Sequence, residues 1–218
     1  MASNETFDFA GPAGRLEAIL MRPPESPPVA AAVVCHAHPL HGGMMHFKVV
    51  FRAAKALQSA GLAVLRFNFR GVGRSEGTHD HGAGEQEDAR GALLEVQGRF
   101  PGLSLVLGGF SFGSTVALRL AARDASVRAV FALGYPLSRP AETAPLEAVR
   151  APRLFVQGEN DEFGSGEALR SRVEPLPPPR EIAVIPGADH FFEGRLDALQ
   201  GVIADWAEAR PWDIAAPP

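Results

Sequence analysis

Short apolar segments alternate with amphipathic segments along most of the chain. Apolar runs of strand length lie at residues 15–23, 30–37, 62–70, 103–110, 127–135, 152–158 and 181–188. From the second run onward most are continuously apolar, which is typical of strands that are covered on both faces. The pattern therefore predicts a mostly parallel sheet.

The segments between these runs carry apolar residues at steps of three and four, which predicts helices. These helices are expected over residues 47–61, 85–100, 114–125, 166–176 and 195–210. An additional strand over 5–10 and the first apolar run are joined by the glycine-rich segment 11–14, which indicates an antiparallel hairpin at the sheet edge. The chain is thus predicted to be one α/β domain over residues 1–218, with about eight strands flanked by helices.

Composition narrows the possible partners. The 218 residues are 46% hydrophobic and 21% charged, the balance of a globular protein, and the net charge is −4 with no basic cluster. The first residues lack a signal-peptide pattern, and no apolar run is long enough to span a bilayer. We expect a cytoplasmic protein that binds small molecules and associates, if at all, with its own copies, and not a partner of nucleic acid or membrane. The single cysteine, Cys35, lies in an apolar run and is expected to be a buried core thiol.

The pattern G-x-S-x-G, which can form a nucleophile elbow, occurs twice, as GRSEG at 73–77 and GFSFG at 109–113. An elbow needs a strand directly before the serine and a helix directly after it. Ser111 meets both conditions, and its flanking glycines are expected where the tight turn leaves no room for a Cβ. Ser75 is followed by a polar segment, so it is predicted to be a loop serine, and Ser111 the nucleophile.

A nucleophilic serine needs a base, and the base needs a group that orients it. In this architecture the acid and then the histidine follow the serine along the chain, and each lies at the carboxyl end of a later strand. His190 is the one histidine of the seven that lies after Ser111. For the acid, the strand at 152–158 is followed by ENDEF, in which Asp161 is the choice and Glu162 the fallback. Asp189, adjacent to His190, is expected to point away.

Two backbone amides should stabilise the oxyanion of the reaction. One is expected from Phe112, directly after the nucleophile. The other must come from the loop HAHPLHGG after the second apolar run, where Leu40 is the candidate and His38 the alternative. Four histidines at 36–46 could suggest a metal cluster, but they lack carboxylate or cysteine partners at ligand spacing. No metal site and no dinucleotide site are expected.

Five motifs together, in their order along the chain, resemble the α/β-hydrolase superfamily, and within it the small, lidless serine esterases and dienelactone-hydrolase-like enzymes. They are HAHPLHGG, NFRGVGRSEG, GGFSFG, GENDEF and GADHFF. The resemblance spans residues 15–208. It implies an eight-stranded, mostly parallel sheet, a triad of Ser111, Asp161 and His190, and no metal or organic cofactor.

The chain departs from these relatives in two ways. Its nucleophile is a serine where dienelactone hydrolases use cysteine, so their lactone substrate is not carried over. The segment between Tyr135 and Arg153 is also too short for a large lid. We therefore expect a serine hydrolase that cleaves small carboxylic esters or thioesters through an acyl-enzyme. The alternatives are a peptidase or acyl-protein thioesterase with the same triad, and a binding protein without enzymatic activity.

Overall fold

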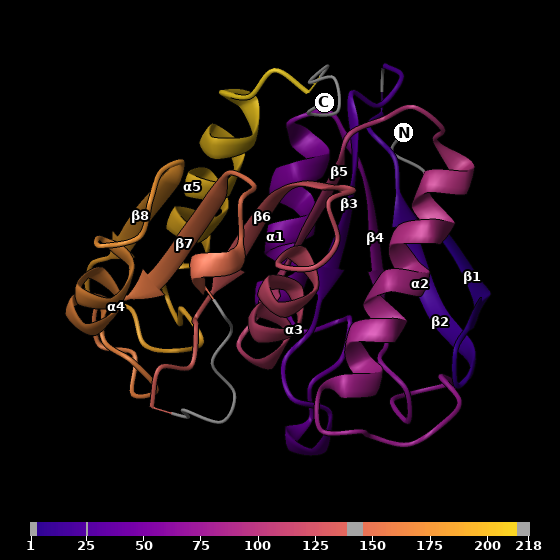
Figure 1. The fold of residues 1–218 in the computed structure, drawn as a ribbon, viewed down its shortest axis with the longest axis horizontal. Helices are drawn as coiled ribbons and strands as arrows, with labels where there is room; N and C mark the ends of the chain where they lie inside the picture. Colours follow the sequence, from indigo (N-terminus) through magenta and orange to yellow (C-terminus); the bar gives the residue numbers. More distant parts are fainter. Residues whose placement is uncertain (1–3, 25, 139–145, 213–218) are drawn as a thin grey trace.

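The computed structural model describes residues 4–24, 26–138 and 146–212, and these form one eight-stranded sheet with five α-helices (Figure 1). The strands are β1 (Asn4–Gly11), β2 (Gly14–Met21), β3 (Ala30–Cys35), β4 (Leu62–Phe67), β5 (Leu105–Phe110), β6 (Val127–Leu133), β7 (Arg153–Gly158) and β8 (Arg180–Ile185). Their order across the sheet is β1-β2-β4-β3-β5-β6-β7-β8. The strands β3 to β8 are mutually parallel, and β2 runs antiparallel to both β1 and β4. The predicted fold class and the edge hairpin are confirmed.

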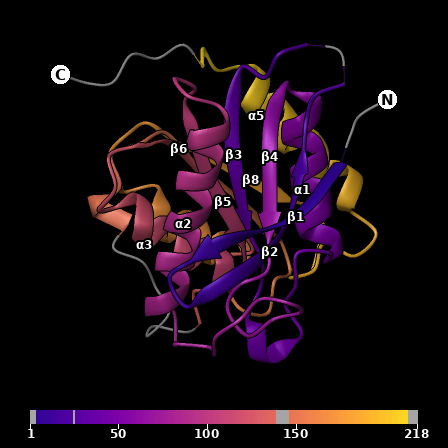
Figure 2. The same ribbon diagram turned by 90° about the vertical axis from the view of Figure 1, so that its right-hand side faces the viewer.

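The helices cover both faces of the sheet. They are α1 (Lys48–Ser59), α2 (Ala83–Arg99), α3 (Phe112–Ala121), α4 (Gly166–Val173) and α5 (Leu196–Glu208). One buried cluster contains side chains of α2, α3 and α4, and the other contains side chains of α1 and α5. Figure 2 shows the sheet between these layers, with α2 and α3 on one side and α1 and α5 on the other. Every residue of β3, β4, β5 and β7 is buried, which explains why these strands are mostly apolar, and the buried exceptions include Arg66, Arg153 and Gln157.

Helix α2 begins at Ala83, two residues earlier than its apolar pattern predicts. Gly82 precedes it with φ 95°, a conformation that glycine adopts without steric cost. The buried Glu85 carboxylate accepts hydrogen bonds from the amides of Asp80 (2.9 Å) and Gly82 (2.7 Å). These bonds satisfy amides that have no partner within the helix, so capping sets the start of α2, and apolar periodicity does not.

The loops that follow the parallel strands all emerge at one edge of the sheet, because parallel strands share their carboxyl ends. Between β6 and β7 the chain has only the segment 134–152, so no large lid is inserted there, as expected. This segment includes the short 3-10 helix η3 (Leu146–Ala148) and residues outside the described ranges. Within the described residues, no helix is long and apolar enough to cross a membrane.

Candidate active site

Ser111 lies between β5 and α3, at the sharp turn that the sequence predicts. Its backbone has φ 54° and ψ −119°, a region that non-glycine residues rarely occupy. A Cβ on Gly109 would lie 2.6 Å from the backbone of Gly113, and a Cβ on Gly113 would lie 2.5 Å from the Cys35 carbonyl oxygen. Both glycines are therefore required by close backbone approach, as expected.

His190 follows β8 and reaches the serine. Its Nε2 atom is 3.0 Å from Ser111 Oγ, and the residue is 3% exposed. The rings of Phe110 and Phe163 pack on the imidazole, with centroids 4.9 and 4.6 Å away. Phe110 is fully buried and belongs to the core. Aromatic packing on two sides restricts the imidazole to the orientation that faces the hydroxyl.

Asp161 lies on the other side of the imidazole. Its Oδ2 atom is 2.8 Å from His190 Nδ1, and its side chain is completely buried. Its Oδ1 atom accepts a hydrogen bond from the Phe163 amide (2.8 Å), which holds the carboxylate in place. The structure thus brings together the three residues that the sequence nominates, Ser111, His190 and Asp161, in one chain of hydrogen bonds.

The neighbouring acidic residues serve the loop backbone and do not approach the imidazole ring nitrogens. Glu159 accepts from the amide of Gly187 at 2.8 Å, and Asp189 accepts from the amide of Glu193 at 2.9 Å. Glu162 lies 3.4 Å from the backbone amide of His190. Asp161, and not Glu162, is therefore the carboxylate on the histidine ring.

Gln157, the buried penultimate residue of β7, was missed by the sequence analysis. Its Nε2 atom donates to Asp161 Oδ2 (2.8 Å), the same oxygen that faces His190, and to the Gly164 carbonyl (2.6 Å). Its Oε1 atom accepts from the Tyr135 amide at 2.9 Å. A glutamine after the apolar residues 154–156 and shortly before the acid was the available signal, because a buried amide needs partners for both its ends.

Ser75 is a structural loop serine, as predicted. Its hydroxyl donates to the Asn68 carbonyl (2.7 Å) and accepts from the Glu17 amide (3.0 Å), and the residue is 6% exposed. The hydroxyl thereby ties the loop after β4 to β2.

Phe112 is the first residue of α3, so its amide has no carbonyl one turn back in the helix to bind. The loop after β3 forms the 3-10 turn η1 (Pro39–His41), and there the Leu40 amide donates to His38 Nδ1 at 3.2 Å. The ring of His38 in turn lies 4.9 Å from that of Phe112, centroid to centroid. The loop therefore lies against the elbow, but the amide of Leu40 is bound by a side chain of its own loop.

His36 anchors that loop. Its Nδ1 atom donates to the Ala37 carbonyl (2.6 Å), and its Nε2 atom accepts from the Phe69 amide (3.0 Å). Complete burial lowers the pKa of the His36 imidazole to about 4, so the neutral ring that this bonding pattern requires is the stable form. Cys35 is completely buried, which confirms it as a core thiol, and this burial raises the pKa of the thiol.

Histidines near the elbow contact one another through their rings. The ring of His38 lies 4.6 Å from that of His41 and 4.8 Å from that of His79, centroid to centroid. His79 Nδ1 also lies 2.8 Å from the buried Glu85 carboxylate. Across the described ranges, no group of three or more histidine, cysteine, aspartate or glutamate side chains is placed to hold a metal ion.

An eight-stranded sheet of this order, with a serine elbow after β5, defines an α/β hydrolase. A model of the alpha/beta hydrolase domain matches residues 30–201, and the chain belongs to this family.

Solved structures agree with this assignment. An alpha-beta serine hydrolase homologue from Coxiella burnetii is 38% identical with a TM-score of 0.87, and the match covers 94% of this chain and 98% of that one. An α/β serine hydrolase without lid from Xanthomonas campestris is 34% identical with a TM-score of 0.86, over 96% and 97% of the two chains. A dienelactone hydrolase from Anabaena variabilis, 22% identical with a TM-score of 0.76 over 94% and 96%, shares the fold. The resemblance to lidless serine hydrolases is confirmed.

Proposed function

We propose that this protein hydrolyses small carboxylic esters or thioesters through a covalent acyl-enzyme on Ser111. The observation that carries the proposal is the continuous pair of contacts from Ser111 Oγ to His190 Nε2 (3.0 Å) and from His190 Nδ1 to Asp161 Oδ2 (2.8 Å). Nucleophile, base and orienting acid in this arrangement are the requirements for serine acyl transfer. Relatives that are described as serine hydrolases support the same reaction class.

Each residue has a defined role in the proposed reaction. His190 Nε2 takes the proton of Ser111 as the hydroxyl oxygen attacks the substrate carbonyl, and it then gives the proton to the leaving alcohol or thiol. Asp161 accepts a hydrogen bond from His190 Nδ1, which keeps Nε2 unprotonated and ready to act as base. Water repeats the same steps on the acyl-enzyme and releases the acid. Water is the only co-reactant of this chemistry.

The oxyanion would be stabilised by the Phe112 amide together with one amide of the loop after β3. The candidate in that loop is Leu40, with His38 as the alternative. The amide of Leu40 already donates to His38 Nδ1 (3.2 Å), so it would have to give up this bond before it could bind the substrate. The positive end of α3 adds to the stabilisation of negative charge at Phe112.

The proposal is tested with a panel of p-nitrophenyl esters, acyl thioesters and peptide p-nitroanilides. We expect hydrolysis of the esters and thioesters, little or none of the anilides, and loss of ester hydrolysis in His190→Ala. Faster cleavage of the anilides would instead favour a peptidase. Absence of hydrolysis across the panel, in protein that is folded by circular dichroism, would favour a binding protein.

A further inference from the structure

A cavity of about 620 Å³ lies next to His190. Two loops form its walls, the segment 42–48 after β3 and the segment 191–196 that directly follows His190. Phe191 belongs to the second wall, and its ring lies 5.3 Å from the imidazole of His190, centroid to centroid. One wall of the cavity is thus continuous with the proposed base.

The first wall also reaches the catalytic elements. Phe47 lines the cavity, and its ring lies 5.9 Å from that of Phe191. The other neighbour of Phe47 is Phe110, on which it stacks at 5.7 Å with an interplanar angle of 13°. Phe110 directly precedes Ser111 and packs on the imidazole at 4.9 Å, so Phe47 and Phe191, which line the cavity, connect it through ring contacts to the residues around the proposed base.

Large apolar side chains at the cavity face solvent, together with the exposed His46, Lys48 and Glu193. Six large hydrophobic side chains are exposed in the described part of the chain, and three of them, Leu40, Met44 and Phe191, lie in the loop after β3 or in the segment after His190. Met44 is 43% exposed and Phe191 is 46% exposed, and both line the cavity. A group of exposed apolar side chains beside a polar catalytic centre is typical of a ligand site.

We propose that this cavity binds the apolar chain or ring of the substrate ester, an inference that rests on the proposed function. Cavities that hold small organic ligands measure roughly 300–1,000 Å³, so the volume of about 620 Å³ is far more than an acetyl or methyl group needs. The charged residues among those lining it, Lys48 and Glu193, are exposed and of opposite sign, so they give the cavity no net charge that would select an ionic group. The preferred substrates are esters with a medium-length alkyl chain or an aromatic ring.

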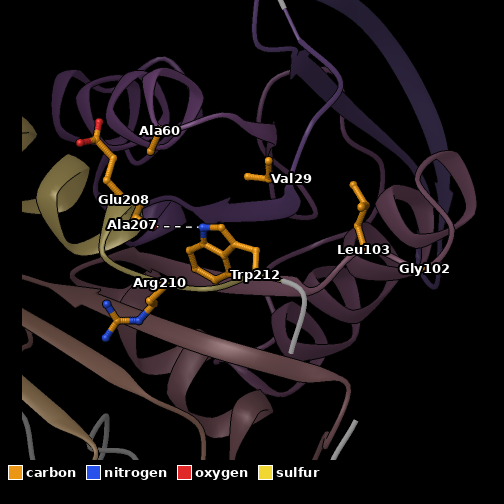
Figure 3. Close-up of a pocket in the computed structure, with 8 residues that line it drawn as sticks. All are labelled: Val29, Ala60, Gly102, Leu103, Ala207, Glu208, Arg210 and Trp212. Atoms are coloured by element: carbon orange, nitrogen blue, oxygen red, sulfur yellow. Dashed lines mark hydrogen bonds between the residues drawn. The ribbon is translucent and has the colours of Figure 1, made fainter. Parts of the chain in front are cut away.

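A cavity of similar size at the opposite edge of the sheet provides the comparison. It measures about 610 Å³ and includes Val29 and Leu103, which precede β3 and β5 and so lie at the amino ends of these strands. Figure 3 shows Trp212 in this cavity, where its Nε1 atom donates to the Ala207 carbonyl at 3.0 Å. Val29 is 47% exposed, close to the value for Met44, so it is a matched control for a change that places a charge on a cavity wall.

The experiment measures kcat/KM for two ester series with the wild type, Met44→Asp and Val29→Asp. In the first series the acyl group grows from acetate through butyrate to octanoate on a constant p-nitrophenol. In the second the alcohol grows from methyl through butyl to octyl on a constant acetate.

Each methylene of the substrate that becomes fully buried should raise kcat/KM roughly fourfold. We expect the wild type to prefer the longest member of one series over the shortest at least about tenfold.

In Met44→Asp this preference should fall roughly tenfold or more, whereas Val29→Asp should retain it. If Met44→Asp lowers the chain-length preference in the acyl series, the acyl group of the substrate occupies the cavity. If it lowers the preference in the alcohol series, the alcohol group occupies it. An equal preference in all three proteins, or no preference in the wild type, overturns the proposal. In that case, if Ser111 still reacts with a short-chain fluorophosphonate, only the cavity proposal fails and the proposed ester hydrolysis stands. Absence of both labelling and ester hydrolysis overturns the proposed function, and the cavity proposal with it.

Discussion

The two G-x-S-x-G motifs of this chain have the same pattern and different surroundings. In 109–113 the serine follows β5 directly, precedes α3, and has its hydroxyl oxygen 3.0 Å from His190 Nε2. In 73–77 the serine lies within a loop, and its hydroxyl is used by two backbone groups of neighbouring segments. The hydroxyl of Ser111 faces a base, whereas that of Ser75 faces an amide and a carbonyl.

The glycines of the two motifs also differ in their physical reason. Gly109 and Gly113 are required because backbone atoms pass within 2.7 Å of where a Cβ would stand. Gly73 and Gly77 have φ values of 58° and 87°, which residues with a Cβ rarely adopt. The sequence pattern alone therefore does not distinguish the proposed nucleophile from a loop serine. A strand directly before the serine and a helix directly after it make the distinction.

The largest effect that separates the two motifs should come from removing each hydroxyl. Ser111→Ala is expected to lower kcat by roughly three to six orders of magnitude, the range of triad deletions. Ser75→Ala should retain most of kcat, but it should lose about 1–3 kcal/mol of unfolding free energy because two buried backbone groups lose their partner. Ester kinetics and urea denaturation of both variants measure the two effects. A folded Ser75→Ala protein that is as inactive as Ser111→Ala would contradict the distinction.

A smaller but still large effect is expected from the steric role of the elbow glycines. Gly113→Ala places a methyl group 2.5 Å from the carbonyl oxygens of Cys35 and His36, and both are backbone atoms that cannot turn aside. We expect a loss of about 3 kcal/mol or more in unfolding free energy, together with loss of ester hydrolysis. Gly98→Ala is the control, because nothing lies within 4 Å of its Cβ and it is within α2. It should stabilise the protein by up to about 1 kcal/mol.

Next in size is the effect of the residue that holds the acid. Gln157→Leu removes the hydrogen bond from Gln157 Nε2 to Asp161 Oδ2 (2.8 Å), so the carboxylate is less firmly held toward His190. We expect kcat to fall about 10- to 100-fold with little change in KM, the value of one hydrogen bond to a charged group.

The isosteric variant Gln157→Glu separates this positioning role from simple packing. It keeps the shape of the side chain, but it places a second carboxylate beside Asp161 and should lower kcat further. The proton resonance of the bond between His190 Nδ1 and Asp161 should also shift in Gln157→Leu. An unchanged resonance and an unchanged kcat would show that Gln157 does not position the acid.

The smallest expected effect concerns the histidine that joins the loop after β3 to the loop that contains Ser75. Burial lowers the pKa of His36 to about 4 in the folded protein, whereas its ordinary value is about 6.5. Between these values the unfolded chain binds a proton that the folded chain does not, so stability falls as pH falls. This group alone should cost about 2 kcal/mol of unfolding free energy between pH 7 and pH 5.

Urea denaturation at the two pH values measures this contribution. His36→Gln, which has no titrating group, should lose that part of the pH dependence, and the exposed His46→Gln should retain it. If the pH dependence is the same in wild type and His36→Gln, the proposed coupling of His36 burial to stability is wrong.

Much of the fold could be predicted because burial leaves a direct trace in the sequence. Strands that are covered on both faces are apolar at most positions, and the eight strands of the sheet overlap the predicted segments. The relation between Ser111 and His190 was also accessible, since only one histidine follows the elbow. The start of α2 was not, because a carboxylate at Glu85 and not an apolar position determines it.

The details of the site depend on contacts between side chains of distant loops, which periodicity does not report. The contact of the Leu40 amide with His38 Nδ1 depends on the conformation of a tight turn. Gln157 stands out in the sequence only as a polar residue after three apolar ones, and its partners Asp161, Gly164 and Tyr135 follow from the folded geometry. The cavity beside His190 likewise arises where two loops meet.

The proposed reaction requires that Ser111, and not Ser75, is activated as a nucleophile. Mass spectrometry of peptides tests this requirement after the native protein has reacted with a fluorophosphonate, which forms an adduct only with an activated serine. One adduct is expected, on the peptide that contains Ser111, and no adduct is expected in His190→Ala. An adduct on Ser75, or none on Ser111 in the folded wild type, would contradict the proposed reaction.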